Sequence, residues 1–139
     1  MKKLLIKRQF HNDFLGKTGI ELIGEPGSGK TLQLVLEAHL NDGILVVPSN
    51  DIAKMRLKDL KIESSNIEIM NYTQFKNSVT HNVYLDNKPV YIDQIDIFQK
   101  QYNLPTSTYR NVCGYTADLI SFDNRFMNEL GNKNMFEEI

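Results

Sequence analysis

Residues 24–31 read Gly-Glu-Pro-Gly-Ser-Gly-Lys-Thr and match the pattern G-x-x-x-x-G-K-[ST] at every fixed position. An apolar run at 19–23 precedes the pattern, and the segment 30–40 that follows it carries apolar residues at roughly helical spacing. A strand that enters a glycine-rich loop and leaves it as a helix is the context that this pattern requires. Chance matches in a chain of this length occur on the order of 1% or below, so this stretch constrains the fold more than any other.

The residue types in this loop suit the binding of phosphate groups. Glycines let backbone N–H groups converge on phosphate oxygens, and the following helix points the positive end of its dipole at them. The Lys30 amine would bridge the outer phosphates, and the Thr31 hydroxyl would ligate Mg²⁺. The sequence therefore predicts a loop that binds ATP or a related nucleotide, formed by Gly24, Glu25, Pro26, Gly27, Ser28, Gly29, Lys30 and Thr31.

The rest of the chain alternates between strand-like and helix-like segments. Apolar runs predict strands at 44–47, 67–70, 90–92 and 109–114, and segments 51–60, 73–79, 95–101 and 121–130 are typical of helices. Residues 83–85 could pair with the strand at 90–92. This order predicts an α/β fold, a three-layer sandwich around a parallel sheet. It would form one domain over 1–139, with a polar, flexible tail at 131–139.

An acidic residue follows the predicted strand at 90–92. Asp93 lies about sixty residues beyond the glycine-rich loop and ends the apolar run Val-Tyr-Ile. A phosphate-binding loop needs a second anchor for Mg²⁺, supplied by an acid at the end of a neighbouring strand. Asp93 is therefore predicted to complete the metal site with Thr31. The alternative is that Asp93 only caps the helix that follows.

Composition limits the partners and the cellular location. The net charge is −1, with 16 basic and 17 acidic residues, so the overall charge does not favour nucleic acid or anionic membranes. No stretch approaches the roughly 20 apolar residues that a membrane span needs, and the N-terminus does not resemble a signal peptide. The chain is expected in the cytoplasm. Its 14 asparagines and 3 alanines suggest an AT-rich genome, such as that of a low-GC bacterium or its phage.

The two stretches GIELIGEPGSGKT and VYIDQID together resemble the P-loop ATPases of the AAA+ and helicase-related division. The resemblance covers about residues 19–120 and implies a P-loop NTPase fold that binds ATP and Mg²⁺. It implies that Lys30 and Thr31 hold phosphate and metal, and that Asp93 completes the metal site. It also implies a polar sensor after the next strand, for which Thr116 is the candidate; a turn or cap role for Thr116 is equally open.

Position 94 departs from the family pattern, which has a catalytic glutamate after the aspartate. Gln94 can orient a water molecule, but its carboxamide cannot accept a proton as a general base. Three explanations stay open. The protein binds ATP and hydrolyses it poorly; or Asp96 or Glu25 supplies the carboxylate; or the glutamine was introduced to trap bound nucleotide.

The resemblance also implies an arginine from a neighbouring subunit, and Arg125 is the candidate late in the chain. The chain leaves no room for the helical lid domain of a full AAA+ protein and little room for a fifth core strand. A basic cluster is expected to be a solvated helix face, with DNA contact as the alternative; it comprises Lys54, Arg56, Lys58 and Lys61.

The sequence thus predicts an ATPase domain that couples its nucleotide state to a partner in DNA replication, packaging or remodelling, as a homo-oligomer or in a larger assembly. One alternative is an ATP-binding interaction module without hydrolysis, which Gln94 favours. Another is a phosphotransferase similar to nucleoside kinases. The chain shows neither an arginine-rich lid nor zinc-binding cysteines, since Cys113 is its one cysteine, and both absences disfavour the kinase.

Overall fold

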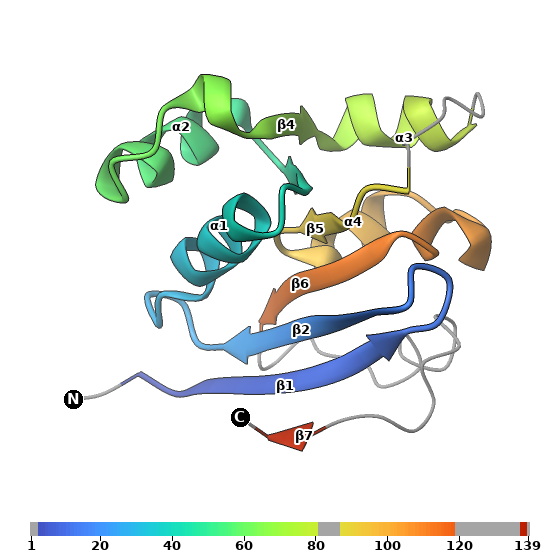
Figure 1. The fold of residues 1–139 in the computed structure, drawn as a ribbon, viewed down its shortest axis with the longest axis horizontal. Coiled ribbons are helices and arrows are strands. Elements are labelled where there is room, and N and C mark those ends of the chain that lie inside the picture. Colours follow the sequence, from blue (N-terminus) through green and yellow to red (C-terminus); the bar gives the residue numbers. More distant parts are fainter. Residues whose placement is uncertain (1–2, 81–86, 119–136, 139) are drawn as a thin grey trace.

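The computed structural model of the chain describes residues 3–80, 87–118 and 137–138. A central sheet crosses the molecule, with helices packed against it (Figure 1). In chain order the elements are β1 (Leu5–Asn12), β2 (Lys17–Gly24), α1 (Lys30–Leu40), β3 (Ile44–Val47), α2 (Asn50–Asp59), the 3₁₀ turn η1 (Ser64–Asn66), β4 (Glu68–Asn71), α3 (Tyr72–Thr80), β5 (Val90–Ile92), α4 (Ile95–Gln101), the 3₁₀ turn η2 (Thr106–Tyr109), β6 (Val112–Asp118) and β7 (Glu137–Glu138).

The strands are ordered β4-β3-β5-β6-β2-β1-β7 across the sheet within the described residues. The five strands from β4 to β2 are parallel to their neighbours, as predicted for an α/β fold. The expectation of little room for a fifth core strand is therefore wrong. The expectation of a purely parallel sheet is also wrong, because β1 runs antiparallel to β2 and β7 antiparallel to β1. The sheet is mixed and mostly parallel.

Strand β1 was not predicted, because its sequence LIKRQFHN does not alternate cleanly between apolar and polar residues. Its full register with β2 runs from the pair Leu5 and Gly24 to the pair Asn12 and Lys17. Only Phe10 and Asn12 in β1 are fully buried. The Asn12 amide donates to the backbone carbonyls of Arg110, just before β6, and of Val112, its first residue, at 2.9 and 2.7 Å. These bonds fasten the hairpin to the parallel part of the sheet.

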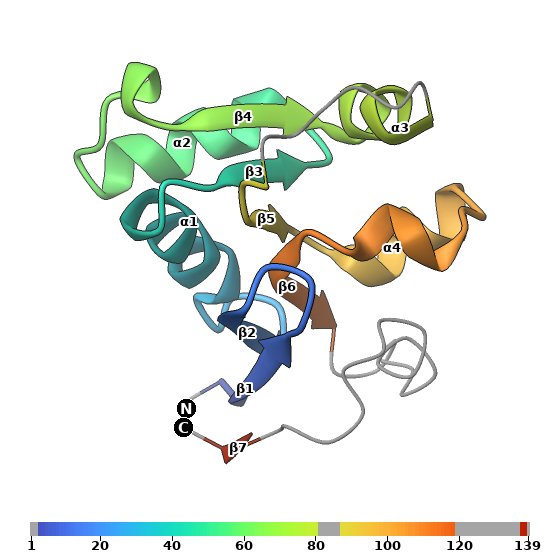
Figure 2. The ribbon, with the colours of Figure 1, turned by 45° about the vertical axis from the view of Figure 1, so that its right-hand side comes forward.

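Helices flank the sheet on both faces, with α1 and α2 on one face and α3 and α4 on the other (Figure 2). The first face buries Leu34, Val35, Ala38, Ala53 and Leu57 against the sheet. The second face is aromatic, and in it Phe98 stacks on Tyr72 with ring centroids 5.1 Å apart. All four residues of β3 are buried, as expected of a strand covered on both faces.

Most predicted boundaries are close to those observed. The helices over 30–40 and 95–101 begin and end where predicted, and α2 and α3 differ by one residue at each end. The strand predicted at 109–114 begins only at Val112, because Pro105 starts a 3₁₀ turn in which the Thr108 N–H bonds to the Pro105 carbonyl. Tyr109 belongs to that turn and not to the strand, and its ring packs on Phe98.

Two predicted segments, 83–85 and 121–130, lie outside the described residues. Of the tail predicted to be flexible, residues 137–138 form β7 and pair with β1. Within the described ranges, no helix has both the length and the apolar character that crossing a bilayer would require.

Candidate nucleotide-binding site

The glycine-rich loop joins the carboxyl end of β2 to the start of α1, as its pattern predicts. Gly27 and Gly29 have φ angles of 81° and 87°, in the left-handed region that costs other residues roughly 1–2 kcal/mol. A Cβ atom at either position would meet no other atom within 4 Å, so backbone conformation alone selects glycine there. Gly29 directly precedes α1 and, as a glycine, has no side chain that could cap that helix. The first N–H groups of α1 are therefore open to an acceptor.

Lys30 and Glu25 make different contacts around this loop. The Lys30 amine donates to the Gly24 carbonyl at 2.6 Å, which folds the side chain back over the loop. The Glu25 carboxylate accepts from the Leu4 N–H at 2.7 Å, and the Glu25 N–H donates to the Leu4 carbonyl at 3.0 Å. Glu25 therefore fastens the loop to the chain just before β1.

Asp93 brings three elements together at the carboxyl edge of the sheet. One of its carboxylate oxygens, Oδ1, accepts from the Thr31 hydroxyl at 3.0 Å and from the Thr116 hydroxyl at 2.6 Å. The same Thr116 oxygen accepts from the Gln94 N–H at 2.7 Å. The predicted site residues Thr31, Asp93, Gln94 and Thr116 thus form one connected network, although they come from α1, the loop after β5, and β6.

The Asp93 carboxylate is in an unfavourable environment for an ionised group. Its side chain is completely buried, and its second oxygen, Oδ2, has no hydrogen-bond partner among the described residues. Burial raises the pKa of Asp93, although the bonds from Thr116 and Thr31 and the charge of Lys30 oppose this. A buried acceptor without a partner is costly. Oδ2 therefore retains an unused acceptor position among the described residues.

Gln94 is held in a strained backbone conformation at the start of α4. Its φ and ψ angles are 56° and 57°, in the left-handed region, and it is not a glycine. The Tyr72 hydroxyl lies 2.5 Å from the Asp93 carbonyl and 2.9 Å from the Gln94 carbonyl, so it bonds to the backbone at both residues. Strained residues that the surroundings fix in this way are concentrated at functional sites.

A cavity of about 550 Å³ lies beside this network. It is lined by Pro26, Gly27, Gly29, Lys30, Thr31, Leu32, Arg56, Gln94, Asp96, Ile97 and Asp118. Five of the eight predicted loop residues and Gln94 line the cavity; Asp93 and Thr116 are buried behind it. Asp96 supplies a carboxylate to the cavity, whereas Glu25 does not. Arg125, the candidate for the arginine that a neighbouring subunit would contribute, lies outside the described residues.

Four residues that line the cavity were not predicted as part of the site: the apolar Leu32 and Ile97, and the charged Arg56 and Asp118. Asp118 ends β6 directly opposite Gly24, and it was missed because the strand was expected to stop at residue 114. Arg56 was placed with the basic cluster of the second helix. Its position offered one signal, since residues 54, 58 and 61 recur at helical spacing and residue 56 does not share their face.

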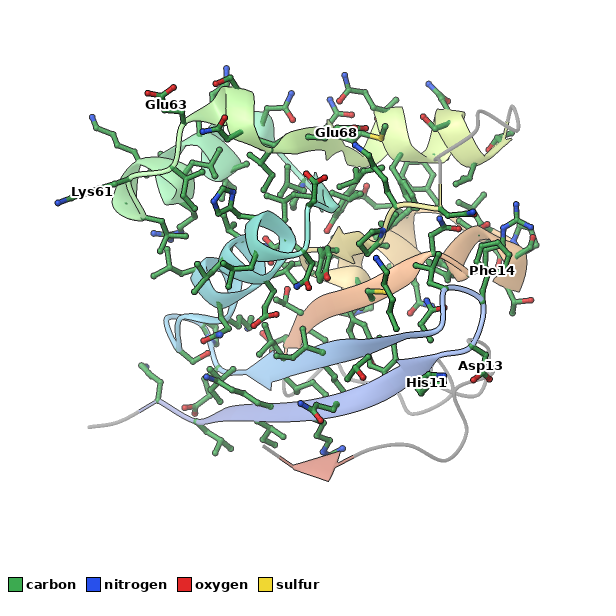
Figure 3. All side chains as sticks on the ribbon, in the orientation of Figure 1. His11, Asp13, Phe14, Lys61, Glu63 and Glu68 are labelled. Carbon is green, nitrogen blue, oxygen red and sulfur yellow. The ribbon has the colours of Figure 1, made fainter. Side chains whose placement is uncertain are left out.

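The lysines of that cluster line a second, separate groove of about 480 Å³, together with Leu57, Ile62 and Glu63. Figure 3 shows Lys61 and Glu63 at the end of the molecule formed by α2 and the turn after it.

The same view shows His11 and Asp13 close together at the β1–β2 hairpin, and an ion-pair distance of 3.5 Å joins His11 Nε2 to Asp13 Oδ1.

Comparisons with known proteins add no relative to this geometry: no protein-family model, no curated protein and no solved structure matches the chain.

Proposed function

We propose that this chain is an ATP- and Mg²⁺-binding domain of the P-loop NTPase type. One observation supports this most directly: the Thr31 hydroxyl meets the Asp93 carboxylate at 3.0 Å beside the open cavity. Thr31 belongs to the G-x-x-x-x-G-K-[ST] pattern, and Asp93 was chosen from the sequence as its metal-binding counterpart. A pair predicted to share one Mg²⁺ is thus in contact.

The donor atoms fit a magnesium ion. Mg²⁺ prefers oxygen ligands and usually takes one or two of them from protein side chains, together with phosphate oxygens and water. Such oxygens are present in Thr31 Oγ1 and in Asp93 Oδ2, which has no hydrogen-bond partner among the described residues. When bound, the ion would offset the negative charge that develops on the phosphate groups during phosphoryl transfer. Thr31 and Asp93 are the residues that would hold it.

Lys30 would bind the outer phosphates of the nucleotide. In the present arrangement its amine donates to the Gly24 carbonyl, a neutral acceptor. A phosphate oxygen is a charged acceptor, so its bond to an ammonium group adds an attraction between opposite charges that the neutral carbonyl lacks. The N–H groups at the start of α1 would bind the same phosphates, since the N-cap residue Gly29 has no side chain to accept from them.

The residues around Gln94 favour slow hydrolysis of ATP. Its carboxamide can position an attacking water molecule but cannot take the proton. Asp96 lies two residues further along in the same cavity, and its Oδ1 is buried without a hydrogen-bond partner among the described residues. Of the two acids that could replace the missing glutamate, Asp96 is better placed, because the Glu25 carboxylate is bonded to Leu4.

The domain would couple its nucleotide state to a partner, such as a replication, packaging or remodelling assembly on DNA. A purely ATP-binding interaction module is the second candidate, and the glutamine at position 94 favours it. Release of inorganic phosphate in the steady state separates the two candidates. Both require the same ATP and Mg²⁺ site.

The direct test is equilibrium binding of ATP with and without Mg²⁺ to the wild-type chain and to Lys30→Ala and Thr31→Ala. We expect Lys30→Ala to weaken binding at least tenfold, and Thr31→Ala to remove most of the gain from Mg²⁺. Lys100→Ala and Thr18→Ala are matched controls, because both residues are exposed and lie outside the cavity. A wild-type chain that binds no nucleoside triphosphate at millimolar concentration would contradict the proposal.

A further inference from the structure

Arg56 is the arginine that lines the cavity within the described part of the chain, where Arg8 and Arg110 do not. It comes from α2, on the face of the sheet that α1 also covers. Its neighbours on α2, Lys54 and Lys58, line the separate basic groove instead. The basic cluster is therefore divided, and Arg56 is its one member that lines the cavity beside the glycine-rich loop.

The charges of the residues around the cavity explain why a second cation would be needed to bind a nucleotide there. Lys30 and Arg56 are the cationic residues in its lining, and Asp96 and Asp118 are the anionic ones. Asp93 is buried immediately behind Thr31. A nucleoside triphosphate remains anionic when Mg²⁺ is bound, and one lysine does not balance both the nucleotide and the aspartates. A guanidinium also matches phosphate geometry through two parallel N–H bonds.

Arg56 is at present paired with its own helix. Its Nη1 lies 3.2 Å from Asp59 Oδ2, one turn further along α2. Both side chains are about half exposed, at 43% and 56%. Exposed ion pairs at this helical spacing contribute little to stability. The guanidinium can therefore leave Asp59 for a phosphate group at small cost.

We propose that Arg56 binds the phosphates of the nucleotide from within the same chain, and that Asp59 competes for it when the cavity is empty. This inference rests on the proposed function. It assigns to α2 of the same subunit a role for which the sequence suggested Arg125 of a neighbouring subunit. It also makes Asp59, which lies outside the cavity lining, a negative regulator of nucleotide affinity.

Two substitutions with opposite expected effects test the proposal, measured as the Kd for Mg-ATP on the full chain. Arg56→Ala should weaken binding about tenfold, and Arg56→Lys should recover part of the loss, because a lysine keeps the charge but not the paired N–H groups. Asp59→Asn should tighten binding about two- to fivefold, the range expected for loss of an exposed ion pair. Lys58→Ala, on the same helix but outside the cavity, should stay within twofold.

The double variant Arg56→Ala/Asp59→Asn separates this mechanism from a general change in surface charge. If Asp59 acts through Arg56, the double variant binds as Arg56→Ala does, and the gain from Asp59→Asn disappears. An Asp59→Asn gain that persists without Arg56 overturns the competition. Wild-type affinity in Arg56→Ala overturns the inference while leaving the proposed function intact, whereas absence of ATP binding in the wild type defeats the proposed function itself.

Discussion

The Thr31 hydroxyl donates to Asp93 Oδ1 at 3.0 Å across 62 residues of sequence. The strands that carry these residues to the edge of the sheet, β2 and β5, are not neighbours, because β6 lies between them. Thr116 of β6 fills the gap and donates to the same oxygen at 2.6 Å. The strand order β5-β6-β2 therefore determines the geometry of the site, and Thr116 holds Asp93 and Gln94 against β6.

Thr116→Val tests whether Thr116 holds Asp93 and Gln94 in place, since valine keeps the shape and removes the hydroxyl. The change leaves the Gln94 N–H without its acceptor and removes one of the two donors to Asp93. We expect the free energy of unfolding to fall by about 1–3 kcal/mol, and ATP turnover to fall with it. Urea denaturation measures the first effect. Thr18→Val, at an exposed position of β2, should change stability by less than about 0.5 kcal/mol; equal losses in both variants would show that Thr116 has no special role.

Gln94→Glu should raise ATP turnover at least tenfold, near the lower range for a positioned general base. The backbone at position 94 is already fixed by the bonds from Tyr72 and to Thr116, so the new carboxylate needs no rearrangement of the loop. Phosphate release at saturating ATP is the measurement. Gln99→Glu, also on α4 but outside the cavity lining, is the control. Unchanged turnover in a variant that still binds ATP would exclude position 94 as the catalytic position.

Asp96→Asn should lower the remaining turnover of the wild-type chain at least tenfold, because a carboxamide cannot accept the proton. The affinity for ATP should change much less, since the loop and Lys30 are untouched. Asp51→Asn, an exposed change in the first turn of α2, is the matched control. Turnover that survives Asp96→Asn unchanged would leave Glu25 or another group as the base.

The sequence predicted best what depends on local periodicity. The helix over 30–40 and the buried strand over 44–47 have their predicted limits, because apolar spacing and the stops at Gly43 and Pro48 specify them locally. Strand β1 could not be found in this way. Strand β1 is held by its pairing with β2 and by hydrogen bonds from the Asn12 side-chain amide to residues about a hundred positions away. Neither kind of contact produces a local sequence pattern.

The residues of the site divide in the same way, into those that the local sequence predicts and those that it does not. Thr31, Asp93, Gln94 and Thr116 were chosen because each follows a strand or a motif, and the structure brings all four into one network. Their roles in nucleotide chemistry stay predictions. Arg56 was not chosen, because its place in the cavity depends on how α2 packs beside α1. Its one local signal was that it lies off the helix face shared by Lys54 and Lys58.

Glu21→Gln tests a buried carboxylate away from the cavity. Glu21 is 1% exposed in the middle of β2, accepts a bond from the Tyr115 hydroxyl and lies 3.6 Å from the Arg8 guanidinium. Burial raises the pKa of Glu21 above its ordinary value of 4.5, because the bond from Tyr115 and the charge of Arg8 only partly compensate. The folded chain therefore holds this proton more tightly than the unfolded chain does.

The contribution of Glu21 to stability is then largest below pH 4.5 and is lost as the pH rises from 4.5 through the raised pKa. We expect the free energy of unfolding of Glu21→Gln relative to the wild type to rise over that interval, by at most about 1.4 kcal/mol per pH unit for one proton. Urea titrations from pH 4 to pH 8 measure the difference. A constant difference across this range would mean that Arg8 and Tyr115 fully compensate the buried charge.

Gly114→Ala tests how closely the sheet packs around Tyr91, whose ring lies between two glycines. A Cβ at Gly114 would come within 2.4 Å of Tyr91 Cδ2, and a Cβ at Gly43 within 2.5 Å of its Cε1. Tyr91 is 3% exposed and cannot move aside freely, so we expect Gly114→Ala to cost about 1–3 kcal/mol of unfolding free energy. Tyr91→Leu removes the ring, and in that background the same alanine should cost much less. A double-mutant cycle measures the coupling; additive losses would show that the alanine is excluded by something other than Tyr91.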